Sequence, residues 1–122
     1  MRKALRIVVV EDDAVIGILL AELLAGMGHD VCAIETTEAG AVTAAAQYDP
    51  DMMIVDVGLG AGSGISAVEK ILRSRPVPHV FVSGNVARSQ MLSPGAVFIE
   101  KPYRESDLVR GILKALSKAA TF

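Results

Sequence analysis

The feature that most constrains this chain is the alternation of short apolar, β-branched runs with longer segments of helical spacing. Residues 5–10 form an apolar run interrupted only by Arg6, which is typical of a strand covered on both faces. In residues 15–27, apolar side chains recur every three or four positions until "GMGHD" ends the pattern. The beginning of the chain therefore predicts one strand followed by one helix.

The same order repeats along the rest of the chain. We expect further strands over 31–35, 51–56, 79–83 and 96–100. We expect further helices over 37–47, 64–73, 86–92 and 108–116, of which the segment at 86–92 is the weakest. Strands that alternate with helices predict an α/β fold, a doubly wound (βα)5 unit with a five-stranded parallel sheet, because right-handed crossovers place helices on both faces.

Composition limits the classes of function. The chain has 122 residues, 52% of them hydrophobic, so we expect residues 1–122 to form a single domain with no output domain attached. A net charge of −2 gives no general attraction for nucleic acid, and no direct nucleic-acid partner is expected. No apolar run approaches the roughly 18 residues of a membrane span, so we expect a cytoplasmic protein without membrane insertion. The single cysteine, Cys32, is interpreted as a buried thiol in a reducing compartment.

Polar side chains follow four of the predicted strands at the point where each strand ends. They are Glu11, Asp12 and Asp13 after the first strand, Asp56 after the third, Ser83 after the fourth and Lys101 after the fifth. In a parallel sheet these ends share one edge, where ligands collect. Adjacent carboxylates repel one another, and a cation relieves that repulsion. The pattern predicts a site for a divalent cation and a phosphoryl group.

Four motifs carry a resemblance to a known family: "VVVEDD", "PDMMIVDVGL…SGI", "VFVSG" and "FIEKPY". In this order and at nearly this spacing, they resemble the receiver domains of two-component response regulators, in particular the stand-alone chemotaxis (CheY-like) type. The resemblance covers essentially the whole chain. It implies the flavodoxin-like fold, with strand order 2-1-3-4-5.

The resemblance also implies roles for individual residues. Asp56 matches the phosphoacceptor. Glu11 and Asp12 match the acidic pair that, with Asp56 and the backbone carbonyl of Gly58, binds Mg²⁺, or Mn²⁺ as an alternative. Lys101, which precedes Pro102, matches the lysine that contacts the phosphoryl group. Ser83 matches the switch hydroxyl and Phe98 the switch aromatic residue.

The function implied by the resemblance is that of a signalling switch. A histidine kinase or histidine phosphotransfer protein donates a phosphoryl group to Asp56, and the surface of the fourth helix, fifth strand and fifth helix changes in response. Such a domain is not an enzyme beyond its own phosphorylation and dephosphorylation. A downstream target protein is a further expected partner, and the expected state is a monomer or a weak, phosphorylation-dependent dimer.

Three departures from the family pattern affect the predicted site. Gly60 stands where the family usually has proline, and the glycines around it leave the conformation of this loop open. Ser83 and Lys101 are only 101 − 83 = 18 positions apart, so the fourth helix must be short or its loops tight. Asn85 follows the hydroxyl and is a candidate cap for that helix.

Two other classes of function remain open. A phosphatase of the haloacid dehalogenase type also uses an aspartate nucleophile and Mg²⁺, but its D-x-D motif and cap insertion are not visible in the sequence. A degenerate receiver that acts only as an unphosphorylated protein-interaction module is the second class. The retention of Asp56, Ser83 and Lys101 argues against it.

The remaining polar residues have structural interpretations. His29 and His79 have no second histidine or cysteine at ligand spacing, so both are expected to be structural. Ser63 and Ser106 are predicted helix caps. A solvated face of the last helix, or alternatively a docking surface, is predicted from Arg104, Arg110, Lys114 and Lys118.

Overall fold

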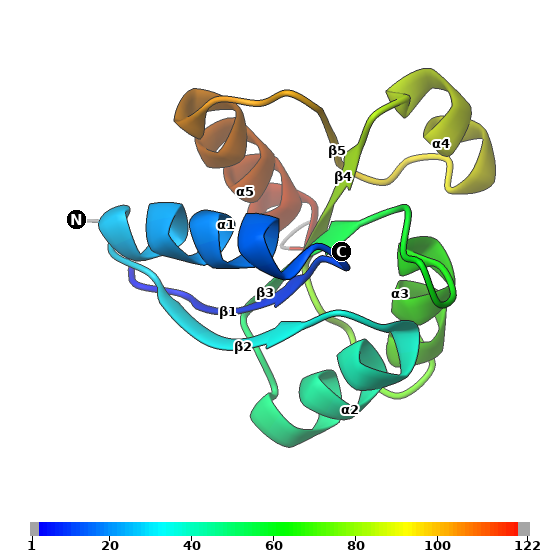
Figure 1. Ribbon diagram of the computed structural model, residues 1–122, viewed down its shortest axis with the longest axis horizontal. Helices are drawn as coiled ribbons and strands as arrows, with labels where there is room; N and C mark the ends of the chain where they lie inside the picture. The colour runs from blue at the N-terminus through cyan, green and yellow to red at the C-terminus, as the bar shows by residue number, and fades with distance from the viewer. Residues whose placement is uncertain (1–2, 120–122) are drawn as a thin grey trace.

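The sheet has the predicted topology. The structure is a computed structural model that describes residues 3–119, so the ends of the predicted domain, 1–2 and 120–122, lie outside the described part. All strand pairs are parallel, in the order β2-β1-β3-β4-β5 (Figure 1). The strands are β1 (Arg6–Val10), β2 (Asp30–Glu35), β3 (Met52–Asp56), β4 (His79–Ser83) and β5 (Phe98–Glu100). The predicted five-stranded parallel sheet and its order are confirmed.

Helices cover both faces of the sheet. They are α1 (Ala14–Gly26), α2 (Glu38–Tyr48), α3 (Gly64–Leu72), α4 (Val86–Leu92) and α5 (Glu105–Ala119). Helices α1 and α5 cover one face and α2 and α3 the other, while α4 projects beyond the end of β4 (Figure 1). None of the helices within residues 3–119 is both long enough and apolar enough to span a lipid bilayer.

The apolar strands are buried on both faces, as their sequences predict. In β1, Ile7 and Val9 point into the core beneath α1 and α5, whereas Val8 and Val10 point into the core beneath α2 and α3. Successive side chains of a strand alternate between faces, so a strand with two covered faces must be apolar at every position. Strand β3 is buried at all five positions, of which the first four are apolar and the last is Asp56.

Some predicted boundaries and caps differ from the structure. β5 has only three residues instead of the five predicted over 96–100, because Ala96 belongs to a turn in which its N–H donates to the Ser93 carbonyl. Ser106 does not cap α5. The helix starts one residue earlier, and the Asp107 carboxylate accepts from the N–H of Arg104, so this predicted cap is wrong.

Other assignments of caps and surface residues are confirmed. Ser63 caps α3 by accepting from the N–H groups of Ile65 and Ser66, and Asn85 caps α4 by accepting from Arg88. The basic residues predicted to be solvated are indeed exposed: Arg104, Arg110, Lys114 and Lys118.

One face of α1 differs from the expectation. Val15 and Leu19, which belong to the apolar pattern at helical spacing, are 66% and 59% exposed, and Ile18 is 51% exposed. Leu20 and Leu24 are buried. The helix is apolar on nearly every side, so its sequence pattern does not specify which face meets the sheet.

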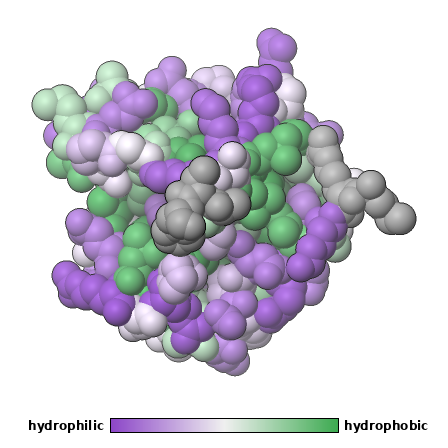
Figure 2. Space-filling view, turned by 180° about the vertical axis from the view of Figure 1, so that it is seen from behind, coloured by the Kyte–Doolittle hydropathy of each residue, from purple (hydrophilic) through white to green (hydrophobic). Residues whose placement is uncertain are grey.

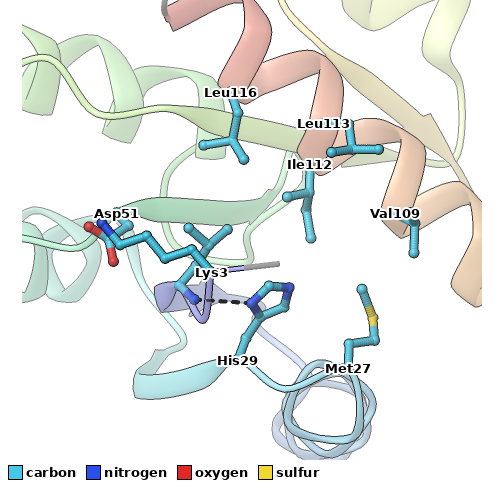
Figure 3. Close-up of a pocket in the computed structure, with 9 residues that line it drawn as sticks. Lys3, Met27, His29, Asp51, Val109, Ile112, Leu113 and Leu116 are labelled. Atoms are coloured by element: carbon cyan, nitrogen blue, oxygen red, sulfur yellow. Dashed lines mark hydrogen bonds between the residues drawn. The ribbon is translucent and has the colours of Figure 1, made fainter. Parts of the chain in front are cut away.

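Cys32 and the two histidines make local contacts. Cys32 is half-buried instead of fully buried, its thiol lies 3.4 Å from the Ile7 carbonyl oxygen, and burial raises the pKa of this thiol. His79 donates from Nδ1 to the Val77 carbonyl at 2.8 Å, and burial lowers its pKa. The Nδ1 of His29 accepts from the N–H of Leu5 at 3.1 Å, in a groove lined on one side by α5 and on the other by Met27, which follows α1 (Figure 3). These contacts agree with structural roles for both histidines.

Candidate functional site

The polar residues predicted from the strand ends meet in one open pocket of about 720 Å³ at the carboxyl edge of the sheet. It is lined by Glu11, Asp12, Asp13, Ile16, Asp56, Val57, Gly58, Ser83, Gly84 and Lys101. The predicted aromatic residue, Phe98, is not among them. The parallel sheet brings these residues together because each follows directly from the end of a neighbouring strand.

Asp56 and Lys101 form the centre of the pocket. Asp56 is the last residue of β3 and is 6% exposed. Lys101 donates from Nζ to Asp56 Oδ2 at 2.5 Å and lies 3.8 Å from Glu11 Oε1. Partial burial acts to lower the pKa of Lys101, but the hydrogen bond to Asp56 and the charges of both carboxylates raise it above its usual value. The lysine is therefore a cation held at the acidic cluster.

Three carboxylates lie close enough to share a cation. One oxygen each from Glu11, Asp12 and Asp56 lies within 4.8 Å of the others. Burial raises the pKa of Glu11 to about 7, although the N–H of Asp13 donates to Glu11 Oε2 at 3.0 Å and acts in the opposite direction. The contact of Asp12 with the Glu11 carboxyl lowers the pKa of Asp12. Three hard oxygen donors at this spacing fit a divalent cation such as Mg²⁺.

Asp13 lines the pocket and is also the N-cap of α1. Its Oδ1 accepts from the N–H groups of Val15 and Ile16 at 3.0 and 3.1 Å, which is the bonding of a helix N-cap. The third acid of the run is therefore the N-cap of α1.

The loop between β3 and α3, residues 57–63, makes hydrogen bonds through the N–H groups of its glycines. The N–H of Gly58 donates to Asp56 Oδ1 at 2.9 Å, and Gly58 forms an antiparallel bridge with Ser63. The N–H of Gly60 donates to Asp12 Oδ2 at 3.1 Å. A proline at this position, as in the family pattern, has no N–H to donate. Gly60 thus ties the loop to the acidic cluster.

Glu38 anchors the other side of this loop. Its Oε1 accepts from the Ser63 N–H at 2.9 Å and its Oε2 from the Ser66 hydroxyl at 2.8 Å. Lys70 Nζ lies 2.5 Å from Oε2. The hydrogen bond from Lys70, followed by those from Ser63 and Ser66, lowers the pKa of Glu38 to about 2. Sequence reasoning missed Glu38, because nothing in the pattern of α2 indicates which loop its first turn meets.

Ser83 has a neighbour that the sequence did not suggest. Its hydroxyl is buried, accepts from the Asn85 N–H at 3.0 Å and lies 2.7 Å from the hydroxyl of Ser89 on α4. Ser89 was not predicted to belong to the site. The only signal available for it was a serine in an otherwise weak helical segment.

Phe98 lies apart from the pocket, at the start of β5. Its ring is half-buried and stacks on the ring of Phe81, with centroids 5.4 Å apart and an interplanar angle of 29°. Both rings belong to the side of the sheet that α2 and α3 cover. The predicted switch aromatic residue is therefore held in an apolar environment next to β4.

The fold and the pocket together define a class of protein, namely doubly wound α/β domains with an acidic cluster and a lysine at the carboxyl edge of the sheet. The family model of the response regulator receiver domain matches residues 7–113. The chain belongs to this family.

Relatives and solved structures agree with this assignment. The phyllosphere-induced regulator PhyR of Methylorubrum extorquens is 30% identical over 93% of this chain and 44% of its own length. The transcriptional regulatory protein PdtaR of Mycobacterium tuberculosis is 31% identical over 93% of this chain and 57% of its own length. The chain thus spans about half the length of these curated relatives.

Two solved structures have the same fold. The NMR structure of the PhyR receiver domain of Erythrobacter litoralis has a TM-score of 0.80 and 30% identity, over 93% of this chain and 91% of that one. The crystal structure of the anti-anti-sigma factor PhyR of Bartonella quintana has a TM-score of 0.83 and 27% identity, over 98% of this chain and 53% of that one.

Proposed function

We propose that this receiver domain is a phosphoacceptor switch whose Asp56 takes a phosphoryl group from a histidine kinase or a histidine phosphotransfer protein. The observation that carries the proposal is the buried Asp56 carboxylate, which has the Lys101 ammonium at 2.5 Å and two further carboxylates beside it. Membership of the receiver family supports the same function.

The transfer uses the Asp56 carboxylate as the nucleophile. It attacks the phosphorus of a phosphohistidine, a P–O bond forms, and the P–N bond breaks as the imidazole leaves with the electron pair and takes up a proton. Lys101, already at the carboxylate, offers its charge to a phosphoryl oxygen, and the Ser83 hydroxyl can donate to another. The chain's own groups thus orient the phosphoryl group.

A divalent cation completes the proposed site. Glu11, Asp12, Asp56 and the backbone carbonyl of Gly58 would hold Mg²⁺, with Mn²⁺ as the alternative. When bound, the ion would offset the negative charge that the carboxylates and the phosphoryl oxygens bring together. The three clustered carboxylates support this assignment.

A protein phosphodonor suits the surroundings of the pocket. Ile16 lines the pocket, and the neighbouring Val15, Ile18 and Leu19 expose apolar surface on α1. Exposed apolar side chains grouped next to a charged site favour contact with another protein. The surface of α4, β5 and α5, to which Phe98 belongs, is the proposed output surface.

The proposal is tested by intact mass after incubation with Mg²⁺ and acetyl phosphate. The parent should gain the mass of one phosphoryl group, and Asp56→Asn should not. Asp30→Asn, which alters an exposed carboxylate at the opposite edge of the sheet, is the matched control and should behave as the parent does. Absence of the increment in the parent would favour the alternative of an unphosphorylated interaction module, and its persistence in Asp56→Asn would refute the assignment of the acceptor.

A further inference from the structure

Helix α4 buries little of its surface against the rest of the domain. Of its seven residues, all of them within the described part of the chain, only Ser89 is buried. Its two large apolar residues near the end, Met91 and Leu92, are 80% and 66% exposed. In the space-filling view, hydrophobic side chains lie at the surface where α4 is located, at the upper left (Figure 2). The helix therefore contributes a serine, and no large apolar side chain, to the buried part of the domain.

The partner of that serine is the hydroxyl at the phosphoacceptor pocket. The Oγ atoms of Ser89 and Ser83 are 2.7 Å apart, and each residue is 5% exposed. Ser83 Oγ also accepts from the N–H of Asn85. A hydroxyl has one proton and two lone pairs, so these two contacts occupy most of its bonding capacity. If the Ser83 hydroxyl turns toward a phosphoryl group on Asp56, its Oγ moves out of the 2.7 Å contact with Ser89 Oγ, and that bond is weakened or lost.

We propose that Ser89 is a positioning residue that holds the Ser83 hydroxyl in the unphosphorylated state and thereby couples the pocket to α4; this inference rests on the function proposed above. Among the described residues, no buried side-chain N or O atom lacks a hydrogen-bond partner. If Ser83 turns to the phosphoryl group, the buried Ser89 hydroxyl loses its partner, and movement of α4 into solvent restores its hydrogen bonding. The serine pair thus opposes switching and releases α4 when switching occurs.

Few other contacts hold this end of α4. The N–H of Val86 lies 3.3 Å from Glu100 Oε1 on β5, and Asn85 caps the helix from within the same segment. Helix α3, by contrast, buries five residues: Gly64, Ile65, Ala67, Val68 and Ile71. Loss of the serine pair therefore removes the contact made by the one residue of α4 that is buried.

The test replaces Ser89 by alanine, which removes the hydroxyl and preserves helix propensity. With Mg²⁺ present, the protein is titrated with beryllofluoride, a mimic of the phosphoryl group, and followed by the amide NMR signals of residues 86–92. Ser89→Ala should reach half-saturation at a roughly 2- to 10-fold lower beryllofluoride concentration, the effect of losing one hydrogen bond that stabilises only the resting state. Ser93→Ala, the same change at the end of α4, should titrate as the parent does.

Two further variants separate positioning from a general effect on the helix. Ser89→Thr keeps a hydroxyl and should return the titration toward that of the parent. In a Ser83→Ala background, Ser89→Ala should have no additional effect, because the two residues act as one unit. Equal titrations of Ser89→Ala and Ser93→Ala, or additive effects of the two serine substitutions, would overturn the inference.

A final measurement does not depend on phosphorylation. In the unphosphorylated protein, amide hydrogen exchange in α4 should be faster in Ser89→Ala than in Ser93→Ala, since the buried anchor is gone. Equal exchange rates would contradict the proposed anchoring. Absence of the phosphoryl mass increment in the parent would instead contradict the proposed function, so the two failures can be distinguished.

Discussion

The segments that follow β3 and β4 leave the same edge of the sheet but are attached to the domain in different ways. The loop 57–63 after β3 is held on one side by Asp12 and on the other by Glu38, and it leads into α3, which buries five residues. The segment after β4 leads into α4, which buries Ser89. We call residues 57–72 the first arm and residues 84–92 the second arm. The helix of the first arm buries five residues beside the strand that ends at Asp56, whereas the helix of the second arm buries one.

The largest expected difference in the free energy of unfolding is between substitutions of Gly64 in the first arm and Gly84 in the second. A Cβ at Gly64 would lie 2.0 Å from the Asp56 carbonyl oxygen and 2.8 Å from Val55 Cγ1, so Gly64→Ala must push β3 and α3 apart. A Cβ at Gly84 would meet nothing within 4 Å. Denaturant unfolding should show a loss of about 3 kcal/mol for Gly64→Ala. For Gly84→Ala the change should stay below about 0.5 kcal/mol. Similar losses for the two variants would remove the distinction between the arms.

The next effect concerns the acidic cluster, which touches the first arm through Gly60. Asp12→Ala deletes a proposed cation ligand and should weaken Mg²⁺ binding at least about tenfold in calorimetric titration. The thermal midpoint of the metal-free variant should stay unchanged or rise, because one of three mutually repelling carboxylates is gone. Coincident Mg²⁺ titrations of variant and parent would mean that the cation binds elsewhere.

A smaller effect, on amide exchange in the loop 57–63, is expected from the removal of the Glu38 carboxylate on α2. Glu38→Ala removes the acceptor for the Ser63 N–H and the Ser66 hydroxyl, so amide exchange in residues 58–63 should become roughly tenfold faster. Exchange in α4 should not change. Glu69→Ala, an exposed glutamate on α3 without such bonds, is the control. Faster exchange in both arms would show that they are coupled through the core and are not held separately.

The smallest effect is a dependence on pH. The pKa of Glu38 is lowered from 4.5 to about 2, mainly by the hydrogen bond from Lys70, so its ionised form is favoured in the folded state. The stabilisation is fully present above the unfolded pKa and is lost as the pH falls through the folded one. The difference in thermal midpoint between the parent and Glu38→Gln should therefore shrink as the pH decreases from 4.5 to 2. A constant difference over this range would argue against an ionised Glu38 as the anchor.

Much of the architecture could be predicted because it depends on residues that are close in sequence. The first four residues of the buried strand β3 form a continuous apolar run, and Asn85 and Ser63 cap helices that start immediately after them. Prediction was wrong or incomplete where the local pattern was ambiguous. Helix α1 is apolar on nearly all sides, so the helical spacing of its apolar residues did not indicate that Val15 and Leu19 are exposed.

The contacts that distinguish the two arms join residues that no local pattern connects. Glu38 and Ser63 are separated by 25 positions, and Asp12 and Gly60 by 48. Even the pair of Ser83 and Ser89, only six positions apart, depends on how a short helix turns back over the end of β4. Their partners follow from the packing of whole elements and not from residue type.

The sequence by itself determined the alternation of strands and helices and the convergence of acids, hydroxyl and lysine at one edge. The period of the apolar residues identifies each element, and a parallel sheet aligns the ends of its strands. Only the tertiary structure decided that Glu38 accepts hydrogen bonds from Ser63 and Ser66 and that the hydroxyl of Ser89 lies 2.7 Å from that of Ser83. Such hydrogen bonds need donor and acceptor within about 3 Å, a distance set by the packing of helices on the sheet and invisible in a one-dimensional pattern.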